Sequence, residues 1–209
     1  MPTENELKFV LKLDDSIQYQ AMEAAYDTLK IEQGYFNAGK DLTVRVRQQL
    51  NREGIIRRFL QVKFNAARST LNDDMKIVED GRRIEVSADI NERDFEDFWK
   101  KTKARVTKTR YLIQTKTHDL HKDEEGNLWT ERWDIDFMKT GDNQIYFSVA
   151  EVEIPERVKE PLFDIPGFIQ ENTLFRVPRR DSRFSNSRLA DVGYATKLYK
   201  LLFSKEKEE

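Results

Sequence analysis

The sequence predicts a mainly β domain of the α+β class, in which about eight antiparallel strands close into a barrel and helices pack on its outside. Three observations lead to this fold. Short stretches alternate apolar and polar residues between turn-forming residues, which is typical of strands. Three other stretches repeat apolar residues at helical spacing. Six strands carry ionised side chains on one face, so a closed sheet could turn its charged face inward.

The strand predictions depend on the alternation. Arg45 and Arg47 alternate with valines, and Asp134 and Asp136 flank an isoleucine. Segments rich in Asp, Asn and Gly are expected as loops, at 69–75, 118–127 and 139–144. The predicted strands cover residues 4–12, 34–37, 42–50, 56–64, 77–90, 106–115, 128–138 and 145–155.

Three helices are expected around these strands. The first runs from Ser16 to Gln33 behind an Asp/Ser capping signal, and the second begins near Asn91. The third covers about 187–204 and is followed by the charged tail 205–209. Because no linker, repeat or change of composition divides the chain, residues 1–209 are expected to form a single domain.

Composition limits the class of protein. The chain has 36 basic and 38 acidic residues, so its formal charge of −2 gives no overall positive field for nucleic acid. It has no cysteine, and no run approaches 18 apolar residues. We therefore expect a cytoplasmic protein, monomeric or homodimeric, with no membrane partner and no specific nucleic-acid partner.

Side chains of both signs are expected inside the barrel. Like charges about 5 Å apart on one strand face repel by roughly 3 kcal/mol at an effective dielectric constant of about 20, so a ligand should compensate them. Basic residues suit phosphate oxygens, and carboxylates without histidine or cysteine suit Mg²⁺ or Mn²⁺. A metal-bridged phosphate chain satisfies both signs. The basic candidates are Lys8, Arg45, Arg47, Lys63, Arg83, Lys108, Arg110 and Arg183; the acidic candidates are Glu4, Glu6, Glu85, Asp134, Asp136, Glu151 and Glu153.

The same residues carry a resemblance to a known family. Glu4, Glu6 and Lys8 form the signature ExExK, and seven further segments and one residue pair follow in the family's order. On this pattern the chain resembles the CYTH superfamily, the triphosphate tunnel metalloenzymes, and most closely its compact bacterial-type members. The matching segments are EQGYF (32–36), LTVRVRQ (42–48), residues 60–63, Arg83 with Glu85, KTRY (108–111), WDID (133–136), AEVEI (150–154) and DSRFSNSRLA (181–190).

The resemblance implies an eight-stranded tunnel that binds a triphosphate and one or two Mg²⁺ or Mn²⁺ ions. It implies a catalytic pair at Lys108 and Tyr35. A lysine crowded by arginines has a lowered pKa, which fits that role. Two plainer interpretations stay open: Lys108 as another phosphate contact and Tyr35 as an ordinary strand aromatic. The implied metal carboxylates are Glu4, Glu6, Glu151 and Glu153, supported by Asp134, Asp136 and Glu85; the implied phosphate ligands are Lys8, Arg45, Arg47, Lys63, Arg83, Arg110 and Arg183.

Three positions depart from the family pattern. Ser87 stands where relatives often carry a second acid, Ser182 where a lysine is common, and Asp134 where glutamate is usual. The first change removes a carboxylate, the second removes a positive charge, and the third shortens the side chain by one methylene. Together they are expected to bear on substrate preference.

The expected reaction is metal-dependent hydrolysis of a terminal phosphoanhydride bond by water. Inorganic triphosphate is the first substrate considered, because no aromatic clamp marks a nucleobase or thiamine site. The alternatives are a nucleoside or thiamine triphosphatase, an RNA 5′-triphosphatase, a class IV-type adenylyl cyclase, and a non-catalytic module that binds polyphosphate or nucleotides.

Overall fold

The computed structural model describes residues 5–37, 42–71, 77–122, 126, 128–155, 158–179 and 181–206. Side chains are described for these residues except 64–71, 77–84, 116–121 and 205–206. The mainly β, α+β class predicted from the sequence is confirmed.

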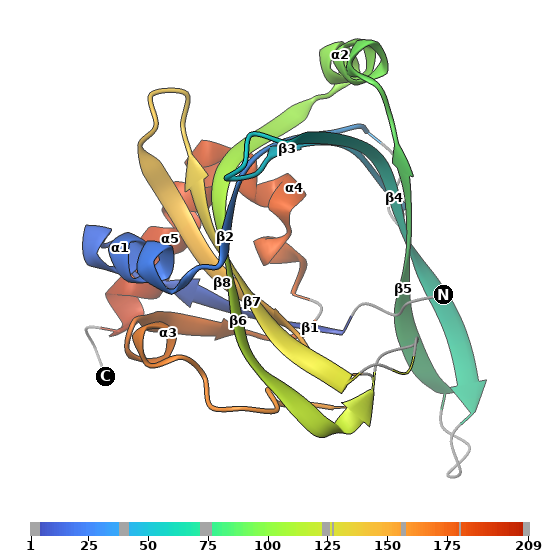
Figure 1. Ribbon diagram of the computed structural model, residues 1–209. Coiled ribbons are helices and arrows are strands. Elements are labelled where there is room, and N and C mark those ends of the chain that lie inside the picture. Colours follow the sequence, from blue (N-terminus) through green and yellow to red (C-terminus); the bar gives the residue numbers. More distant parts are fainter. Residues whose placement is uncertain are drawn as a thin grey trace.

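In the described part of the chain, nine strands form a single antiparallel sheet (Figure 1). The order across the sheet is β5-β4-β3-β2-β6-β7-β8-β1-β9. Strands β2 to β5 and strands β6 to β8 are each consecutive neighbours. The two groups meet at the β2/β6 pair, and β1 lies between β8 and β9. The sheet curls, and β4 and β5 stand opposite β7 and β8 across its concave side (Figure 1). The strands are β1 (Glu6–Leu11), β2 (Asp27–Tyr35), β3 (Leu42–Leu50), β4 (Ile56–Leu71), β5 (Ile77–Asp89), β6 (Ala104–Lys122), β7 (Leu128–Lys139), β8 (Ile145–Glu153) and β9 (Thr173–Val177).

The predicted closed eight-stranded barrel is wrong, because the sheet stays open. Closure would require β1 to pair with β5, at the far end of the strand order. Instead β1 pairs with β8 on one side and with β9 on the other, as where Lys8 lies opposite both Glu151 and Val177. The short strand β9, which the sequence pattern did not reveal, therefore occupies the edge of β1 that would pair with β5 in a closed barrel.

The helices also differ from the expectation. Helix α1 (Asp15–Ala24) starts at the Asp14 cap, whose side chain accepts from the Ser16 amide at 2.7 Å, but it ends well before Gln33. Residues 27–33 of the predicted first helix belong to strand β2, and the predicted third helix is divided into two. The remaining helical elements are α2 (Glu92–Lys101), α3 (Gly167–Glu171), η1 (Ser182–Phe184), α4 (Asn186–Leu189) and α5 (Val192–Glu206).

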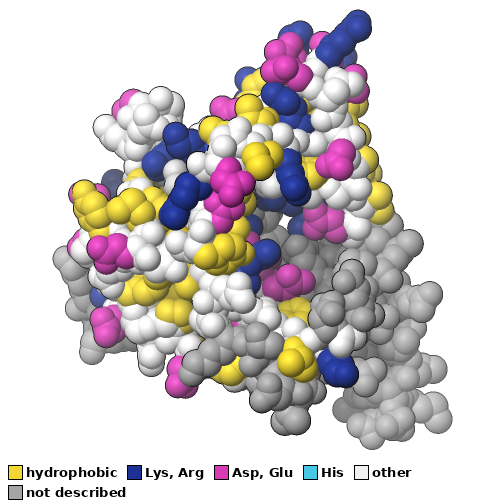
Figure 2. Space-filling view, viewed as in Figure 1, with side chains coloured by type: hydrophobic (Ala, Val, Ile, Leu, Met, Phe, Trp, Pro, Cys, Tyr) yellow, Lys and Arg dark blue, Asp and Glu magenta, His cyan; other side chains and the backbone are white. Residues whose placement is uncertain are grey.

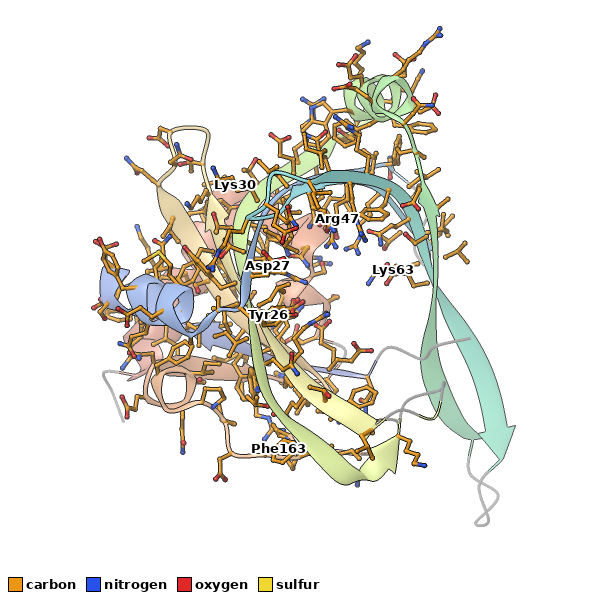
Figure 3. The ribbon with its side chains drawn as sticks, viewed as in Figure 1. Tyr26, Asp27, Lys30, Arg47, Lys63 and Phe163 are labelled. Carbon is orange, nitrogen blue, oxygen red and sulfur yellow. The ribbon has the colours of Figure 1, made fainter. Side chains whose placement is uncertain are left out.

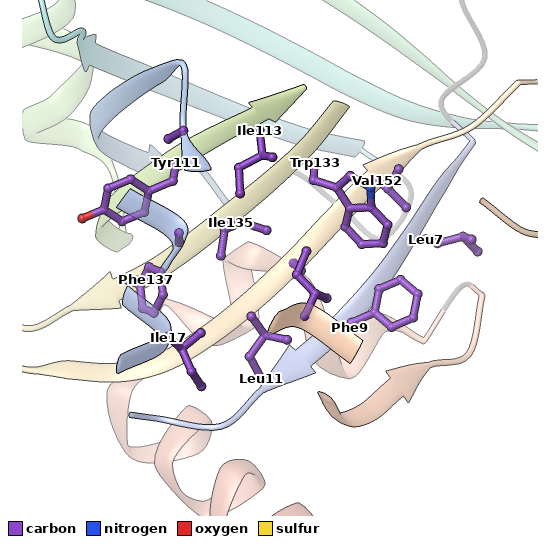
Figure 4. Packing of buried hydrophobic residues seen from close by; sticks show 14 of the residues in the cluster. Leu7, Phe9, Leu11, Ile17, Tyr111, Ile113, Trp133, Ile135, Phe137 and Val152 are labelled. Atoms are coloured by element: carbon purple, nitrogen blue, oxygen red, sulfur yellow. The ribbon is translucent and has the colours of Figure 1, made fainter. Parts of the chain in front are cut away.

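Each face of the sheet carries its own hydrophobic core. On the convex face, α1 and α3 cover a cluster centred on Phe9 and Trp133, whose rings lie 5.5 Å apart (Figure 4). On the concave face, α4 and α5 cover a second cluster that includes Val10, Met138 and Val149. This second cluster occupies only part of the concave face. The remainder is charged.

Gly34 of β2 lies against the residue that follows α2. A Cβ atom built on Gly34 would fall 2.6 to 2.8 Å from three side-chain atoms of Thr102. Thr102 cannot move freely, because its hydroxyl donates to the Trp99 carbonyl at 2.8 Å and accepts from Arg105 Nε at 3.0 Å. Gly34 therefore lets β2 pack closely here, next to Tyr35.

We predict that Gly34→Ala lowers the free energy of unfolding by about 1–3 kcal/mol, because the added methyl group overpacks this contact. Urea denaturation measures the change. Gly141→Ala is the matched control, since nothing lies within 4 Å of a Cβ built at Gly141. Equal stabilities of the two variants would contradict the close approach.

Candidate functional site

The part of the concave face next to the second core, here named the charged face, is formed by alternate residues of the strands, and Tyr35 belongs to both. The registers bring partners side by side: Lys63 lies opposite Glu85, and Arg110 lies opposite Asp136. Figure 2 shows a hollow in the molecule with basic and acidic side chains around it. The predicted site residues on this face are Glu6, Lys8, Tyr35, Arg45, Arg47, Lys63, Glu85, Lys108, Arg110, Asp134, Asp136, Glu151 and Glu153.

Three predicted site residues are not brought to this face by the described side chains. Glu4 lies outside the described residues, and Arg83 lies in β5 with its side chain outside them. Arg183 belongs to η1, and its side chain is 55% exposed. Its Nη2 lies 2.6 Å from Asp181 Oδ2, so its described ion pair is local.

One half of the charged face is an acid-rich cluster, made of Glu6, Lys8, Lys108, Arg110, Asp134, Asp136 and Glu151. Arg110 binds three carboxylates: Nε donates to Asp136 at 2.7 Å, Nη2 donates to Glu151 at 2.9 Å, and Nη1 donates to Asp134. Lys8 Nζ lies 2.7 Å from Glu151 Oε1 and 3.3 Å from Glu6 Oε1. The fully buried Lys108 ammonium pairs with Asp136. These four carboxylates therefore already hold internal cations.

The other half is an arginine cluster, made of Arg45, Arg47, Lys63, Glu85, Gln33, Gln61 and Tyr35. Its carboxylate, Glu85, lies 2.8 Å from Lys63 Nζ and 3.5 Å from Arg45 Nη2. Arg47 binds the neutral Gln33 instead, through Nε at 3.2 Å and Nη2 at 3.1 Å. Figure 3 shows Arg47 and Lys63 pointing into the space that the curved sheet surrounds. Cations therefore exceed acids in this half.

The excess of positive charge in the arginine cluster is unfavourable for Arg47. Among the described residues no carboxylate forms an ion pair with it. Burial, together with the charges of Arg45 and Arg110, lowers the pKa of Arg47. A guanidinium group keeps its proton in proteins, so Arg47 cannot lower the electrostatic energy of its buried charge by deprotonation. A bound anion would lower that energy.

The two lysines of the acid-rich cluster have opposite pKa shifts. Burial and the charge of Arg110 lower the pKa of Lys108 to about 8, although Asp136 pulls in the other direction. Burial also disfavours the charged form of Lys8, but the carboxylates of Glu151 and Glu6 outweigh it and raise its pKa. Lys108 can therefore exchange a proton near neutral pH, whereas Lys8 stays a cation.

The sequence interpretation missed Gln33 and Gln61. Each glutamine accepts from an arginine Nε on the charged face: Gln33 from Arg47 at 3.2 Å, and Gln61 from Arg45 at 2.8 Å. Alternation could have identified Gln61, which shares a strand face with Lys63. Gln33 was hidden because its segment was predicted to be helical.

Four carboxylates of the acid-rich cluster are candidate ligands for a divalent cation. Arg110 bridges three carboxylates, but in the described part of the chain no three acidic or histidine side chains are placed so that they could hold a metal ion by themselves. Glu6 and Glu151 nevertheless each place an oxygen near the Lys8 ammonium, so both can reach one cation. Mg²⁺ is usually held by one or two carboxylates plus substrate phosphates and water. The pair therefore fits a metal ion that arrives with a phosphate.

A separate cavity of about 380 Å³ lies at the β9 edge, lined in part by Lys159, Arg176 and Arg179. Arg176 pairs with Glu160 at 2.8 Å, and Arg179 donates to the Val158 carbonyl at 2.9 Å. Lys159, Arg176 and Arg179 are all exposed, so water solvates their charges. This cavity therefore lacks the buried positive charge of the arginine cluster.

No helix among the described residues is long and apolar enough to span a membrane. No family model matches the chain. No curated protein matches it either.

Three solved structures from Pyrococcus show a weak likeness to the fold. PH1012 protein of Pyrococcus horikoshii OT3 has a TM-score of 0.45 and 11% identity, over 74% of this chain and 80% of that one. PH1819 protein of the same organism has a TM-score of 0.42 and 15% identity, over 96% and 89%. Conserved hypothetical protein Pfu-838710-001 of Pyrococcus furiosus has a TM-score of 0.43 and 10% identity, over 95% and 90%. With TM-scores below 0.5, these likenesses bear on neither fold nor function.

We predict that Arg110→Met lowers the free energy of unfolding by about 3–5 kcal/mol, because it leaves three mostly buried carboxylates without their shared cation. Urea denaturation measures this loss. Arg132→Met is the matched control: Arg132 also pairs with Asp134, at 3.0 Å, but its side chain is 50% exposed. Its loss should cost less than about 1 kcal/mol. Similar losses in both variants would show that burial does not set the strength of these pairs.

A pH dependence follows from Lys108. Its pKa of about 8 in the folded protein lies below that of an unfolded lysine, about 10.4, so the unfolded protein binds more protons between these values. The free energy of unfolding should therefore rise with pH across this window, by about 1–2 kcal/mol from about pH 7.5 to 9.5. Urea denaturation at both pH values should show the rise in the parent protein and not in Lys108→Met. The same slope in both proteins would place the pKa of Lys108 at its ordinary value.

Proposed function

We propose that the charged face binds a short polyphosphate, with inorganic triphosphate as the first candidate, and hydrolyses its terminal phosphoanhydride bond with Mg²⁺ or Mn²⁺. The observation that carries this proposal is Arg47, a guanidinium group without a carboxylate partner among the described residues, whose charge adds to that of Arg45 on the same strand face. A cytoplasmic location, expected from the cysteine-free composition, is part of the proposal.

The arginine cluster would hold the phosphate oxygens. Arg45 and Arg47 offer planar pairs of N–H donors, and Lys63 offers a compact charge. Both arginines are fixed through Nε by a glutamine, which leaves donors of the guanidinium fork for a ligand. Because these contacts are set before binding, they would stabilise the charge that develops on the phosphate in the transition state.

The acid-rich cluster would serve the reacting end. Mg²⁺ or Mn²⁺, held by Glu6 and Glu151 together with the phosphates, would neutralise charge on the phosphate oxygens. Lys108 would take a proton at Nζ from the attacking water, since its pKa of about 8 leaves part of the population neutral near pH 7.5. The water oxygen bonds to the terminal phosphorus, the bond to the bridging oxygen breaks, and phosphate and diphosphate leave.

Released phosphate tests the proposal against a substrate panel. Inorganic triphosphate and diphosphate, ATP, thiamine triphosphate and longer polyphosphate are each incubated with Mg²⁺ or Mn²⁺, and the ATP reaction is also assayed for cyclic product. Triphosphate is expected to be turned over fastest, only with metal. Cyclic product without phosphate release, or no release from any substrate, would overturn the proposed reaction.

Lys8→Met, Glu6→Gln and Arg47→Met should each lower kcat/KM for triphosphate by about a hundredfold or more, as expected for losing a charge contact in the transition state. Arg58→Met is the matched control, because Arg58 of β4 faces the convex side, where it pairs with Glu92 at 2.9 Å. The control should keep the parent rate. Unchanged kcat/KM in the three site variants would remove the charged face from the reaction.

A further inference from the structure

Gln33 lies fully buried between two functional side chains of the charged face. Its Oε1 accepts from Arg47 Nε at 3.2 Å and from Arg47 Nη2 at 3.1 Å, and its Nε2 donates to the Tyr35 hydroxyl oxygen at 2.7 Å. One amide group thus links Arg47, which has no acidic partner among the described side chains, to the tyrosine beside it.

These contacts fix the orientation of the amide. A guanidinium group has only donors, so the amide oxygen must face Arg47 and the amide nitrogen must face Tyr35. The flipped amide would place donors against donors. Since the Tyr35 oxygen accepts this bond, its own hydrogen is left for another acceptor.

The neutrality of the amide matters as much as its geometry. A carboxylate at this position would form an ion pair with Arg47 and cancel the positive charge that would otherwise attract an anionic ligand. It would also accept the Tyr35 hydrogen instead of donating to the oxygen. Burial raises the pKa of Tyr35, so its hydroxyl keeps this hydrogen at neutral pH.

We propose that Gln33 is a positioning residue that holds Arg47 and Tyr35 so that both donate to the same phosphoryl group of the ligand. The inference rests on the proposed function, since it names the part of that site that binds phosphate without metal. Gln33 touches neither the phosphate nor the attacking water. It acts through the two side chains that it orients.

Gln33→Glu tests the inference, because it changes one amide to a carboxylate of the same shape. The probe is inorganic triphosphate in EDTA, with affinity measured by titration calorimetry and stability by the urea midpoint. We expect the affinity to fall about tenfold or more, as for the loss of a charge-assisted contact, while the urea midpoint stays the same or rises. A purely structural role for Gln33 would not weaken binding without lowering the midpoint.

Gln48→Glu is the matched control. Gln48 lies next to Arg47 in β3 but faces the other side of the sheet, where it accepts from Arg58 Nε at 2.6 Å and donates to Glu32 at 3.3 Å. It introduces the same charge and should keep the parent affinity. If Gln33→Glu does not fold, Gln33→Met replaces it, since methionine can neither accept from Arg47 nor donate to Tyr35, and weaker binding is again expected.

The outcomes separate the two proposals. Binding within about twofold of the parent in a folded Gln33 variant overturns the inference and leaves the hydrolase proposal standing. Metal-free binding that is lost in Gln33→Glu, in a protein that releases no phosphate from triphosphate, supports the inference and overturns the hydrolysis. A parent protein that does not bind triphosphate overturns both.

Discussion

The charged face depends on Arg110, a single cation shared by carboxylates of two neighbouring strands. Its guanidinium group bonds Asp134 and Asp136 of β7 and Glu151 of β8. Without it, these carboxylates would repel one another in a partly desolvated space, and burial of their charges would oppose the packing of β6, β7 and β8. Glu151 in turn holds Lys8 of β1 at 2.7 Å. One network therefore connects four adjacent strands.

In the other half of the face, the arginine cluster, carboxylates compensate the positive charge only in part. Glu85 pairs with Lys63 and Arg45, while the one described acceptor bound to Arg47 is the amide oxygen of Gln33. A neutral acceptor satisfies the N–H groups of a guanidinium but leaves its charge uncancelled. The two halves therefore suit different ligands. In the acid-rich cluster a metal ion could replace Lys8 beside Glu6 and Glu151. In the arginine cluster the cations outnumber the carboxylates, so an anion would compensate them. A phosphate that arrives with a divalent ion would supply both.

Alternation predicted most of this face, because the side-chain period of a strand decides which residues share a face, whatever the curvature. Arg45, Lys63, Arg110 and Glu151 were placed correctly on that ground. The open sheet could not be predicted in this way. It depends on β9, a strand of only five residues whose pairing with β1 is a long-range contact. Helical spacing also concealed β2, and with it Gln33, because Leu29 follows Ala25 and Tyr26 by four and three residues and so continued the pattern of the first helix.

The boundary between the two parts of the concave face explains the pKa of Lys108. In the ladder, Lys108 lies between Ile31 of β2 and Met138 of β7, both fully buried, and Met138 belongs to the core under α4 and α5. Two residues further along the same face of β6, Arg110 lies among the carboxylates of the acid-rich cluster. The ammonium of Lys108 thus has apolar neighbours on either side and a carboxylate, Asp136, as its paired counterion. Desolvation and the charge of Arg110 outweigh the attraction of Lys108 to Asp136 and Glu151, whereas Lys8, placed between two carboxylates, stays charged. The packing of the core therefore contributes to the desolvation that lowers the proton affinity of the lysine next to it.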